Sequence, residues 1–298
     1  CIGKGNRPVS FHGDAVVLGC GGFEGNAEMM TRYIGPRATH LGMMSRGCHY
    51  NKGEGIRMAL DIGAAPCGEF GSWHASPMDP RSSRAGASIY IYPYGMLVNR
   101  LGARFTDEAP GPTDETYENV ARTINAQPGG IAWAVLDAAT SDQPNRNAVL
   151  RTEHGPVEAD SLEGLAAKLG LPAEAFLATV ATYNAACRPG RFAALELDEL
   201  ATDGLAIRKS NWARPIAVAP FRAWPIISSC VFTFGGLRVN PRAQVVNTEG
   251  DPIPGLYAAG ETMGLYYGTY TGATSVLKGL VFGRLAGLDA ARQMQLAM

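Results

Sequence analysis

The sequence predicts an α/β fold that an α+β insertion interrupts. Residues 14–19 form an apolar, β-branched run that ends in glycines, which is typical of a strand followed by a tight turn. Residues 255–261 form a second short apolar run, and a glycine-rich crossing separates it from a long helix that begins near Thr274. From about Ser76, turns, mixed strands and helices follow one another. We therefore expect one discontinuous α/β domain and an inserted α+β domain.

In the first part of the α/β domain, the run at 14–19 predicts a buried strand. A short helix is expected after Asn26, and a second helix over about residues 56–62, where Gly63 ends it.

In the insertion, residues 96–99 and 131–136 are the clearest extended runs, and residues 114–126 between them have the spacing of a helix. Residues 188–215 are rich in Pro, Arg, Gly and Ala with weak periodicity, which predicts a long surface connection. The chain is then expected to return to the α/β domain through residues 216–227.

Composition favours a small-molecule role. The 298 residues include 26 Lys and Arg against 27 Asp and Glu, for a net charge of -1. No basic run stands out, so nothing indicates a nucleic-acid partner. The histidines other than His74 are scattered, with no helical metal-ligand spacing, and we expect no metal site.

Cysteine usage and hydropathy predict a cytoplasmic protein. The six cysteines have neither C-x-x-C spacing nor the density of a disulfide scaffold, so we expect mostly buried thiols in a reducing compartment. No apolar run approaches the length of a membrane span, and the N-terminal residues lack the pattern of a signal peptide.

The segment at residues 255–284 is the most informative for function. A helix N-terminus carries unpaired N–H groups and a partial positive charge, and the crossing before Thr274 lets it face an electron-rich ring or an anion. Ala-Ala-Gly-Glu at residues 258–261 precedes that crossing. This layout is typical of a flavin site.

The order of motifs resembles the fumarate reductase and succinate dehydrogenase flavoprotein superfamily. The matching segments are residues 14–26, 53–64, 98–108, 258–261 and 274–284. The resemblance implies FAD as cofactor, an FAD-binding domain over residues 1–75 and 227–298, and a capping domain over 76–226. It also implies a set of FAD-binding residues: Gly21, Gly22, Gly260, Glu261, Thr274, Ser275 and Val276.

The chain contains no G-x-G-x-x-G turn, which in the superfamily holds the FAD pyrophosphate at a helix N-terminus. We therefore expect the FAD-binding domain to be partial, with roughly the first third of a complete flavoprotein missing. The face where that unit would dock is expected to be covered by a missing segment or by a second copy of the chain.

The residues that bind a dicarboxylate in the fumarate-reducing branch are largely replaced. The position of the proton-donating arginine falls on or near Pro112, a binding histidine is replaced by Phe232, and a last arginine by Tyr270. Only His74 stands near the position of a substrate-binding histidine. These departures argue against fumarate reduction.

Tyrosines next to the flavin-facing helix are the candidate catalytic groups. A tyrosine beside a flavin can donate a hydrogen bond to a carbonyl or accept a proton. Tyr270 is the first candidate, followed by His74 and Tyr267. For at least one of Tyr266 and Tyr267 we expect packing rather than catalysis, and a structural hydrogen bond is the alternative role for His74. For Arg104 we expect structural pairing with Glu108 or Asp107.

The predicted activity is an FAD-dependent CH–CH dehydrogenase. Residues 92–100 and 127–132 resemble the tricarballylate dehydrogenase branch, which implies oxidation of a carboxylate with electrons passed to an acceptor protein. Two alternatives remain open: a desaturase of cyclic ketones similar to ketosteroid dehydrogenases, and a truncated, non-catalytic fragment or assembly subunit.

Overall fold

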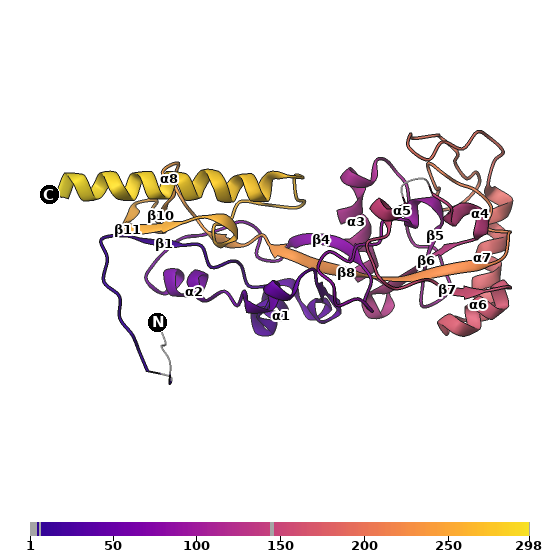
Figure 1. Cartoon of the computed structure of the whole chain (residues 1–298), viewed down its shortest axis with the longest axis horizontal. Helices are drawn as coiled ribbons and strands as arrows, with labels where there is room; N and C mark the ends of the chain where they lie inside the picture. Colours follow the sequence, from indigo (N-terminus) through magenta and orange to yellow (C-terminus); the bar gives the residue numbers. More distant parts are fainter. Residues whose placement is uncertain (1–4, 6, 144–145, 298) are drawn as a thin grey trace. The chain divides into compact units, whose positions relative to one another are not determined.

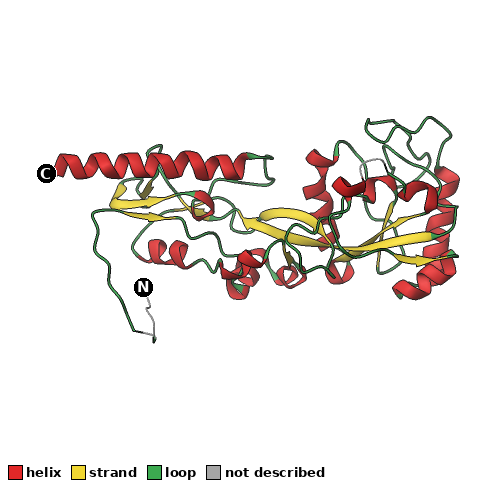
Figure 2. Ribbon diagram, in the orientation of Figure 1, coloured by secondary structure: helices red, strands yellow, loops and turns green. Residues whose placement is uncertain are grey.

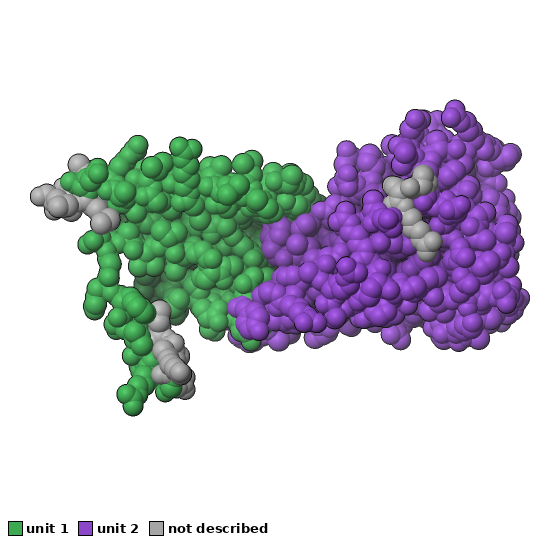
Figure 3. Space-filling model, in the orientation of Figure 1, with its two compact units in different colours: residues 1–26, 51–72, 233–298 green, residues 27–50, 73–232 purple. Residues whose placement is uncertain are grey.

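A computed structural model of the chain describes residues 5, 7–143 and 146–297 (Figure 1). The chain divides into two compact units, coloured separately in Figure 3. The first unit comprises residues 1–26, 51–72 and 233–298, and the second comprises residues 27–50 and 73–232. Each unit is described by itself below.

The first unit is built on a small mixed sheet and one long helix. The sheet has the order β1-β11-β10, with β1 parallel and β10 antiparallel to β11, and β3 pairs with β9 separately. The elements are β1 (Val16–Leu18), α2 (Glu54–Asp61), β3 (Pro66–Cys67), β9 (Gly236–Leu237), β10 (Gln244–Val246), β11 (Pro252–Ala258), η5 (Gly260–Thr262) and α8 (Thr274–Ala297).

Helix α8 packs along this sheet, as Figure 1 shows. Tyr257 of β11 and Ala286 of α8 are fully buried in one apolar cluster, and the Tyr257 hydroxyl donates to Asp289 Oδ2 at 2.9 Å. Strand β1 forms an edge of the sheet, and Val16 and Val17 are 53% and 47% exposed. The strand was therefore predicted correctly, but its burial was not: among the described strands β1 pairs with β11 alone, and successive side chains of β1 are exposed.

The second unit contains a six-stranded sheet with helices around it (Figure 2). The strands follow the order β2-β8-β6-β5, and β4 and β7 also pair with β8. The strands are β2 (Gly42–Met43), β4 (Trp73–Met78), β5 (Met96–Asn99), β6 (Ile131–Leu136), β7 (Val157–Ala159) and β8 (Phe221–Thr233). The helices are α1 (Ala27–Ile34), η1 (Pro36–His40), η2 (Arg46–Tyr50), η3 (Tyr92–Tyr94), α3 (Thr113–Asn125), η4 (Pro128–Gly130), α4 (Ala138–Ser141), α5 (Arg146–Val149), α6 (Leu162–Leu169) and α7 (Ala173–Ala186).

Both faces of this sheet are covered. On β5, Leu97 points into one buried cluster with Trp224, whereas Met96 and Val98 point into another with Phe176. This alternation follows the two-residue period of a strand. Because both sets are apolar, β5 is a continuous hydrophobic run, and the strands predicted at 96–99 and 131–136 are confirmed.

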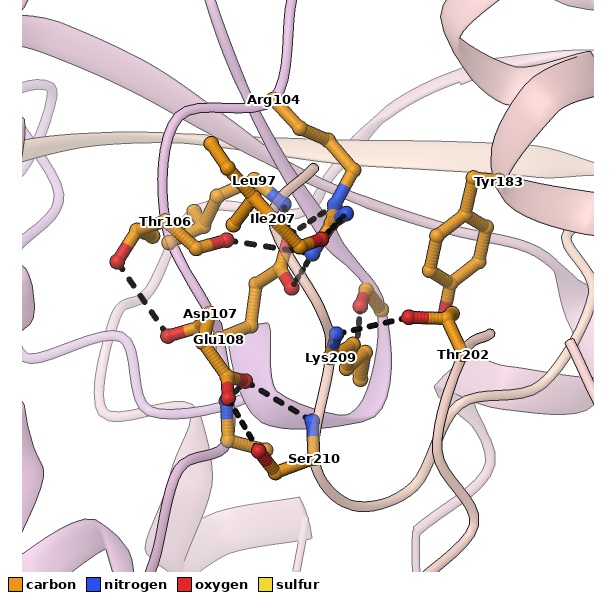
Figure 4. A network of polar contacts seen from close by, with 12 residues as sticks. Leu97, Arg104, Thr106, Asp107, Glu108, Tyr183, Thr202, Ile207, Lys209 and Ser210 are labelled. Atoms are coloured by element: carbon orange, nitrogen blue, oxygen red, sulfur yellow. Dashed lines mark hydrogen bonds and ion pairs between the residues drawn. The ribbon is translucent and has the colours of Figure 1, made fainter. Parts of the chain in front are cut away.

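A buried polar network ties the segment 198–212 to the strand β5 and the turn that follows it (Figure 4). Arg104 pairs with Glu108 at 2.7 Å, and Glu108 also accepts a hydrogen bond from Leu97 N at 2.9 Å. Lys209 is fully buried and donates to the carbonyl oxygens of Pro93 and Gly95. The pairing predicted for Arg104 is confirmed.

The prediction of a surface connection over residues 188–215 is wrong in one respect, because part of this segment is buried. The segment has no helix or strand, as expected, but Lys209 and Trp212 are buried. Trp212 Nε1 donates to the carbonyl oxygens of Ala193 and Glu196. Such side chain to backbone bonds replace regular pairing, and they leave no periodic pattern in the sequence.

The two compact units do not coincide with the ranges of the predicted domains. The chain stays in the sheet of the second unit along β8 to Phe232, later than the predicted return over residues 216–227, and residues 27–50 also belong to the second unit. The predicted domain boundaries and the capping role stay predictions.

Among the described cysteines, which are all free, Cys48 and Cys230 are buried, whereas Cys20 is exposed and Cys67 and Cys187 are half-buried. No helix among the described residues is long and apolar enough to cross a membrane.

Candidate functional site

The turn after β1 lies against the segment that follows β11. Gly21 has a φ of +80°, which favours glycine, and its carbonyl oxygen accepts a hydrogen bond from Thr262 Oγ1 at 3.0 Å. A Cβ added at Gly22 would lie 2.2 Å from both Glu261 Oε1 and Thr233 Oγ1. Only glycine therefore allows this approach.

Glu261 is held at this contact by main-chain and side-chain donors. Its Oε1 accepts hydrogen bonds from Thr233 N at 2.7 Å and from Thr233 Oγ1 at 3.2 Å. Gly260, just before it, has a φ of +67° and open space where a side chain would be. The structure thus brings Gly21, Gly22, Gly260 and Glu261 together, as a shared site requires.

A second carboxylate, which the sequence did not single out, lies beside Glu261. Asn51 Nδ2 donates to Glu24 Oε1 at 2.6 Å and reaches Glu261 Oε2 at 3.5 Å. Burial, together with the neighbouring charge of Glu261, raises the pKa of Glu24 to about 8. Burial also raises the pKa of Glu261. At neutral pH this acid pair therefore retains a proton.

The crossing before α8 places tyrosine hydroxyls at the helix N-terminus. Tyr270 Oη lies 3.0 Å from Ser275 Oγ and accepts a hydrogen bond from Ser275 N at 3.2 Å. Tyr266 is buried, and its Oη lies 3.0 Å from Thr274 Oγ1. The hydroxyl of Tyr270 thus satisfies one of the helix N–H groups that would otherwise be unpaired.

Tyr267 faces a different environment from its neighbours. Its side chain is 63% exposed, and its hydroxyl accepts a hydrogen bond from Gly68 N at 2.9 Å and lies 3.6 Å from Cys67 Sγ. Val276, the last predicted cofactor-binding residue, is 71% exposed on the first turn of α8.

A buried lysine follows on α8. Lys278 Nζ donates to Met263 O at 3.1 Å and lies 4.7 Å from the centre of the Tyr266 ring. Burial lowers the pKa of Lys278 to about 8, although the nearby charge of Glu261 opposes this shift. The sequence motif contained this lysine, but periodicity alone does not show that it points inward.

In the second unit, His74 of β4 lies among aromatic side chains. Its Nε2 is 2.7 Å from the hydroxyl of Tyr117 on α3, and its ring is 5.0 Å from the ring of Phe232. Burial, and then the charge of Arg122, lower the pKa of His74 to about 4. His74 is therefore neutral at physiological pH, and Tyr117, which lies within the helix predicted over residues 114–126, is a further candidate site residue.

Comparison with known families decides which proteins this chain resembles. Residues 2–277 match the family described as FAD binding domain. The chain belongs to the FAD binding domain family. The predicted membership of the fumarate reductase and succinate dehydrogenase flavoprotein superfamily is confirmed, and the family assignment gives FAD as the cofactor.

Individual relatives cover nearly all of this chain. An NADH:acrylate oxidoreductase from Vibrio harveyi is 30% identical over 290 residues, which are 92% of this chain and 26% of that protein. A 4-oxocyclohexanecarboxylate 2-dehydrogenase from Sinomonas cyclohexanicum is 30% identical over 94% of this chain and 51% of that protein. A flavocytochrome c3 fumarate reductase in an open conformation superimposes with a TM-score of 0.72 and 27% identity, covering 94% of this chain and 46% of that one. The chain thus spans about half, or less, of the length of these relatives.

The residues around Glu261 fit the hydroxyl-bearing part of FAD. Two carboxyl groups converge there, and apart from the proton that the pair retains, no donor to the buried Glu24 Oε2 is present among the described residues. A ribityl hydroxyl group supplies the O–H donor that such an acceptor lacks. Glu261 and Glu24 would hold the cofactor at these atoms. Among the described residues no group of three His, Cys, Asp or Glu side chains that could hold a metal ion was found.

Proposed function

We propose that this chain carries the flavin site of an FAD-dependent oxidoreductase that acts on a CH–CH bond of a small molecule. The family match and the convergence of Gly22, Glu24 and Glu261 support this proposal. When bound, the flavin supplies the acceptor for a hydride. The protein must then orient the substrate and manage the proton that leaves the neighbouring carbon.

Tyr270 is our choice for proton handling. Its hydroxyl lies at the N-terminus of α8, where Ser275 N already donates to it. A phenol hydroxyl at this position can donate a hydrogen bond to a substrate carbonyl or take part in proton transfer, and the hydroxyl of Ser275 lies 3.0 Å from it. Tyr267 is the second candidate on this crossing, because its exposed side chain is open to a ligand.

His74 would act as a neutral hydrogen-bonding residue toward the substrate. Its low pKa excludes a positively charged imidazole at neutral pH. Of its two ring nitrogens, Nε2 is engaged with Tyr117. This arrangement suits a carbonyl or carboxylic acid group better than an ion pair with a carboxylate.

For the substrate we propose a carboxylate-bearing small molecule similar to tricarballylate, oxidised in the cytoplasm with electrons passed to an acceptor protein. The alternative is a cyclic ketone of the ketosteroid kind. The name of the relative from Sinomonas describes a substrate that is both a carboxylate and a cyclic ketone, so this relative supports both substrate classes. A third alternative is a non-catalytic fragment or assembly subunit.

The first experiment is a visible absorption spectrum of the purified chain with and without added FAD. A perturbed flavin band that persists after gel filtration supports the proposed site. The loaded chain is then incubated with an artificial electron acceptor and with polycarboxylates, cyclic ketones and cyclic keto acids. A chain that retains no flavin, or that retains flavin and oxidises none of these classes, would favour the non-catalytic alternative.

Tyr270→Phe tests the proton-handling role. Removal of a general acid or base costs about 10²–10⁴-fold in turnover, and we expect a loss in this range with unchanged flavin content. Tyr50→Phe, at an exposed tyrosine of the other unit, is the matched control. A Tyr270→Phe variant that turns over at the wild-type rate removes this residue from the mechanism.

A further inference from the structure

A pocket in the second unit collects cationic and hydroxyl side chains. Its volume is about 410 Å³, and the segments around β2, η2 and the turn after β4 line it. The lining residues include Arg46, Arg84 and His49, together with the serines Ser45 and Ser83. Among the described residues that line the pocket, none carries a carboxylate. The lining is therefore rich in hydrogen-bond donors and in cationic residues.

The two arginines lack close partners of opposite charge. In the part of the chain that the structure describes, no carboxylate oxygen lies within 4.0 Å of the guanidinium groups of Arg46 or Arg84, whereas Arg81 on the same turn pairs with Asp79 at 2.7 Å. Glu153 is an acidic group on which Arg84 acts. A hydrogen bond from Ser82 at 2.6 Å lowers the pKa of Glu153 most, and the charge of Arg84 lowers it less. Neither arginine therefore has its charge neutralised by a close ion pair among the described residues.

The turn that presents Arg84 is fixed before any ligand arrives. Asp79 is fully buried and accepts hydrogen bonds from Arg81 N at 2.9 Å, from Arg81 Nη2 at 2.7 Å and from Thr152 Oγ1 at 2.8 Å. Gly86 N donates to Met44 O at 3.0 Å, which joins this turn to the segment that carries Arg46. A site held in this way loses little conformational entropy on binding.

The other part of the pocket lining is apolar. It consists of Leu41, Met43, Met78 and Ile227. A Cβ added at Gly42 would lie 2.6 Å from Met78 Sδ, so the backbone at Gly42 packs directly on this side chain. A volume of this size is typical of small-molecule sites, which combine apolar walls with a few polar groups. Such a lining suits a ligand that has a short carbon body and an oxyanion.

We infer that this pocket binds a small organic dianion, a phosphate ester or a dicarboxylate, through Arg46 and Arg84. Arginine recognises both oxyanions with paired N–H donors, and serine hydroxyls add further donors. The pocket shares no residue with the flavin site proposed above, and its proposal does not depend on that function.

The test measures binding of two probes, inorganic phosphate and succinate, to the purified chain by equilibrium dialysis at low ionic strength. The chain is used with and without saturating FAD, because FAD would compete with a probe that binds where the cofactor's own phosphates bind but not with a probe in this pocket. We expect one saturable site per chain, and about a tenfold or greater loss of affinity in the Arg46→Gln/Arg84→Gln double variant. Arg37→Gln/Arg57→Gln is the control, since it removes the same charge at two exposed arginines outside the pocket.

The two probes distinguish the source of the ligand. Saturation by phosphate alone assigns the pocket to phosphate esters, and saturation by succinate alone assigns it to dicarboxylates. If neither probe saturates, or if both double variants lose affinity equally, the proposal is overturned. Ser83→Ala, at an exposed side chain, gives a second check, because a smaller loss is expected from one neutral donor.

Discussion

The two units bury charged side chains in opposite ways. In the second unit, Arg104, Glu108 and Lys209 lie in one network in which each charge faces an opposite charge or main-chain partners (Figure 4). In the first unit, Glu24 and Glu261 are two acids side by side; Asn51 and Thr233 donate to them as neutral groups, and the charge of Lys278 acts on Glu261. A buried glutamate therefore pairs closely with an arginine in one unit and lies beside a second carboxyl group in the other.

The difference in how these buried charges are paired distinguishes a cluster that stabilises the fold, in the second unit, from the proposed cofactor site in the first unit. A buried charge costs free energy unless it is paired and hydrogen-bonded. The network of the second unit meets that condition within the protein, so its role is to hold the segment 198–212 in place. The acid pair of the first unit avoids a second buried charge by retaining a proton, and hydrogen bonds from a bound molecule would stabilise the charge that remains.

The largest effect is expected from Glu108→Ala. It leaves the Arg104 guanidinium buried without its carboxylate and Leu97 N without its acceptor, so we expect a loss of about 3–5 kcal/mol in the free energy of unfolding. Urea unfolding followed by circular dichroism measures it. Glu158→Ala removes a half-exposed partner of Arg222 and should cost only about 0.2–1 kcal/mol. Equal losses in the two variants would show that the buried network stabilises the fold no more than an exposed ion pair does.

The second effect concerns FAD. Glu261→Gln keeps an oxygen for Thr233 N but removes the negative charge, and hydrogen bonds to charged groups contribute about 1.5–3 kcal/mol. We expect the Kd for FAD, measured by quenching of flavin fluorescence, to rise about tenfold to a hundredfold. Glu54→Gln on α2, an exposed acid, should leave it unchanged. An unchanged Kd in Glu261→Gln contradicts a role in cofactor binding.

The third effect is a pH dependence carried by Asp79 in the second unit. Burial by itself would raise the pKa of Asp79, but hydrogen bonds from Arg81 and Thr152 outweigh it and lower that pKa. A lowered pKa means that stability is present at neutral pH and is lost as the pH falls through the folded-state pKa. Asp79→Asn should cost about 1–3 kcal/mol at pH 7 and progressively less in acid. A cost that is constant from pH 7 to pH 2 would refute this assignment.

The fourth effect has the opposite sign and belongs to Glu24. Its pKa is raised to about 8, so the folded chain holds a proton that the unfolded chain has lost above an ordinary pKa of 4.5. Stability therefore falls as the pH rises from about 4.5 to 8, by at most about 1.4 kcal/mol per pH unit for one proton. Glu24→Gln should flatten this decline in melting temperature, whereas Glu28→Gln, an exposed acid, should not. An equally steep decline in Glu24→Gln would show that Glu24 does not hold the proton.

Local patterns predicted the regular elements of the fold well. The strands at β5 and β6 and the helix α3 have clear two-residue or helical periods, because each buries apolar side chains on defined faces. The same reasoning missed the buried part of residues 198–212. That segment is fixed by hydrogen bonds between Asp198 or Asn211 and main-chain groups, which follow no period.

The sequence by itself determined the family and the cofactor, since glycines and Glu261 stand in a specific local order. Only the tertiary structure decided which side chains meet across long separations. Glu24 reaches Glu261, Tyr117 reaches His74, and Arg46 and Arg84 line one pocket. Their chemistry depends on burial and neighbouring charge, and the packing of distant segments, which no local pattern encodes, sets both.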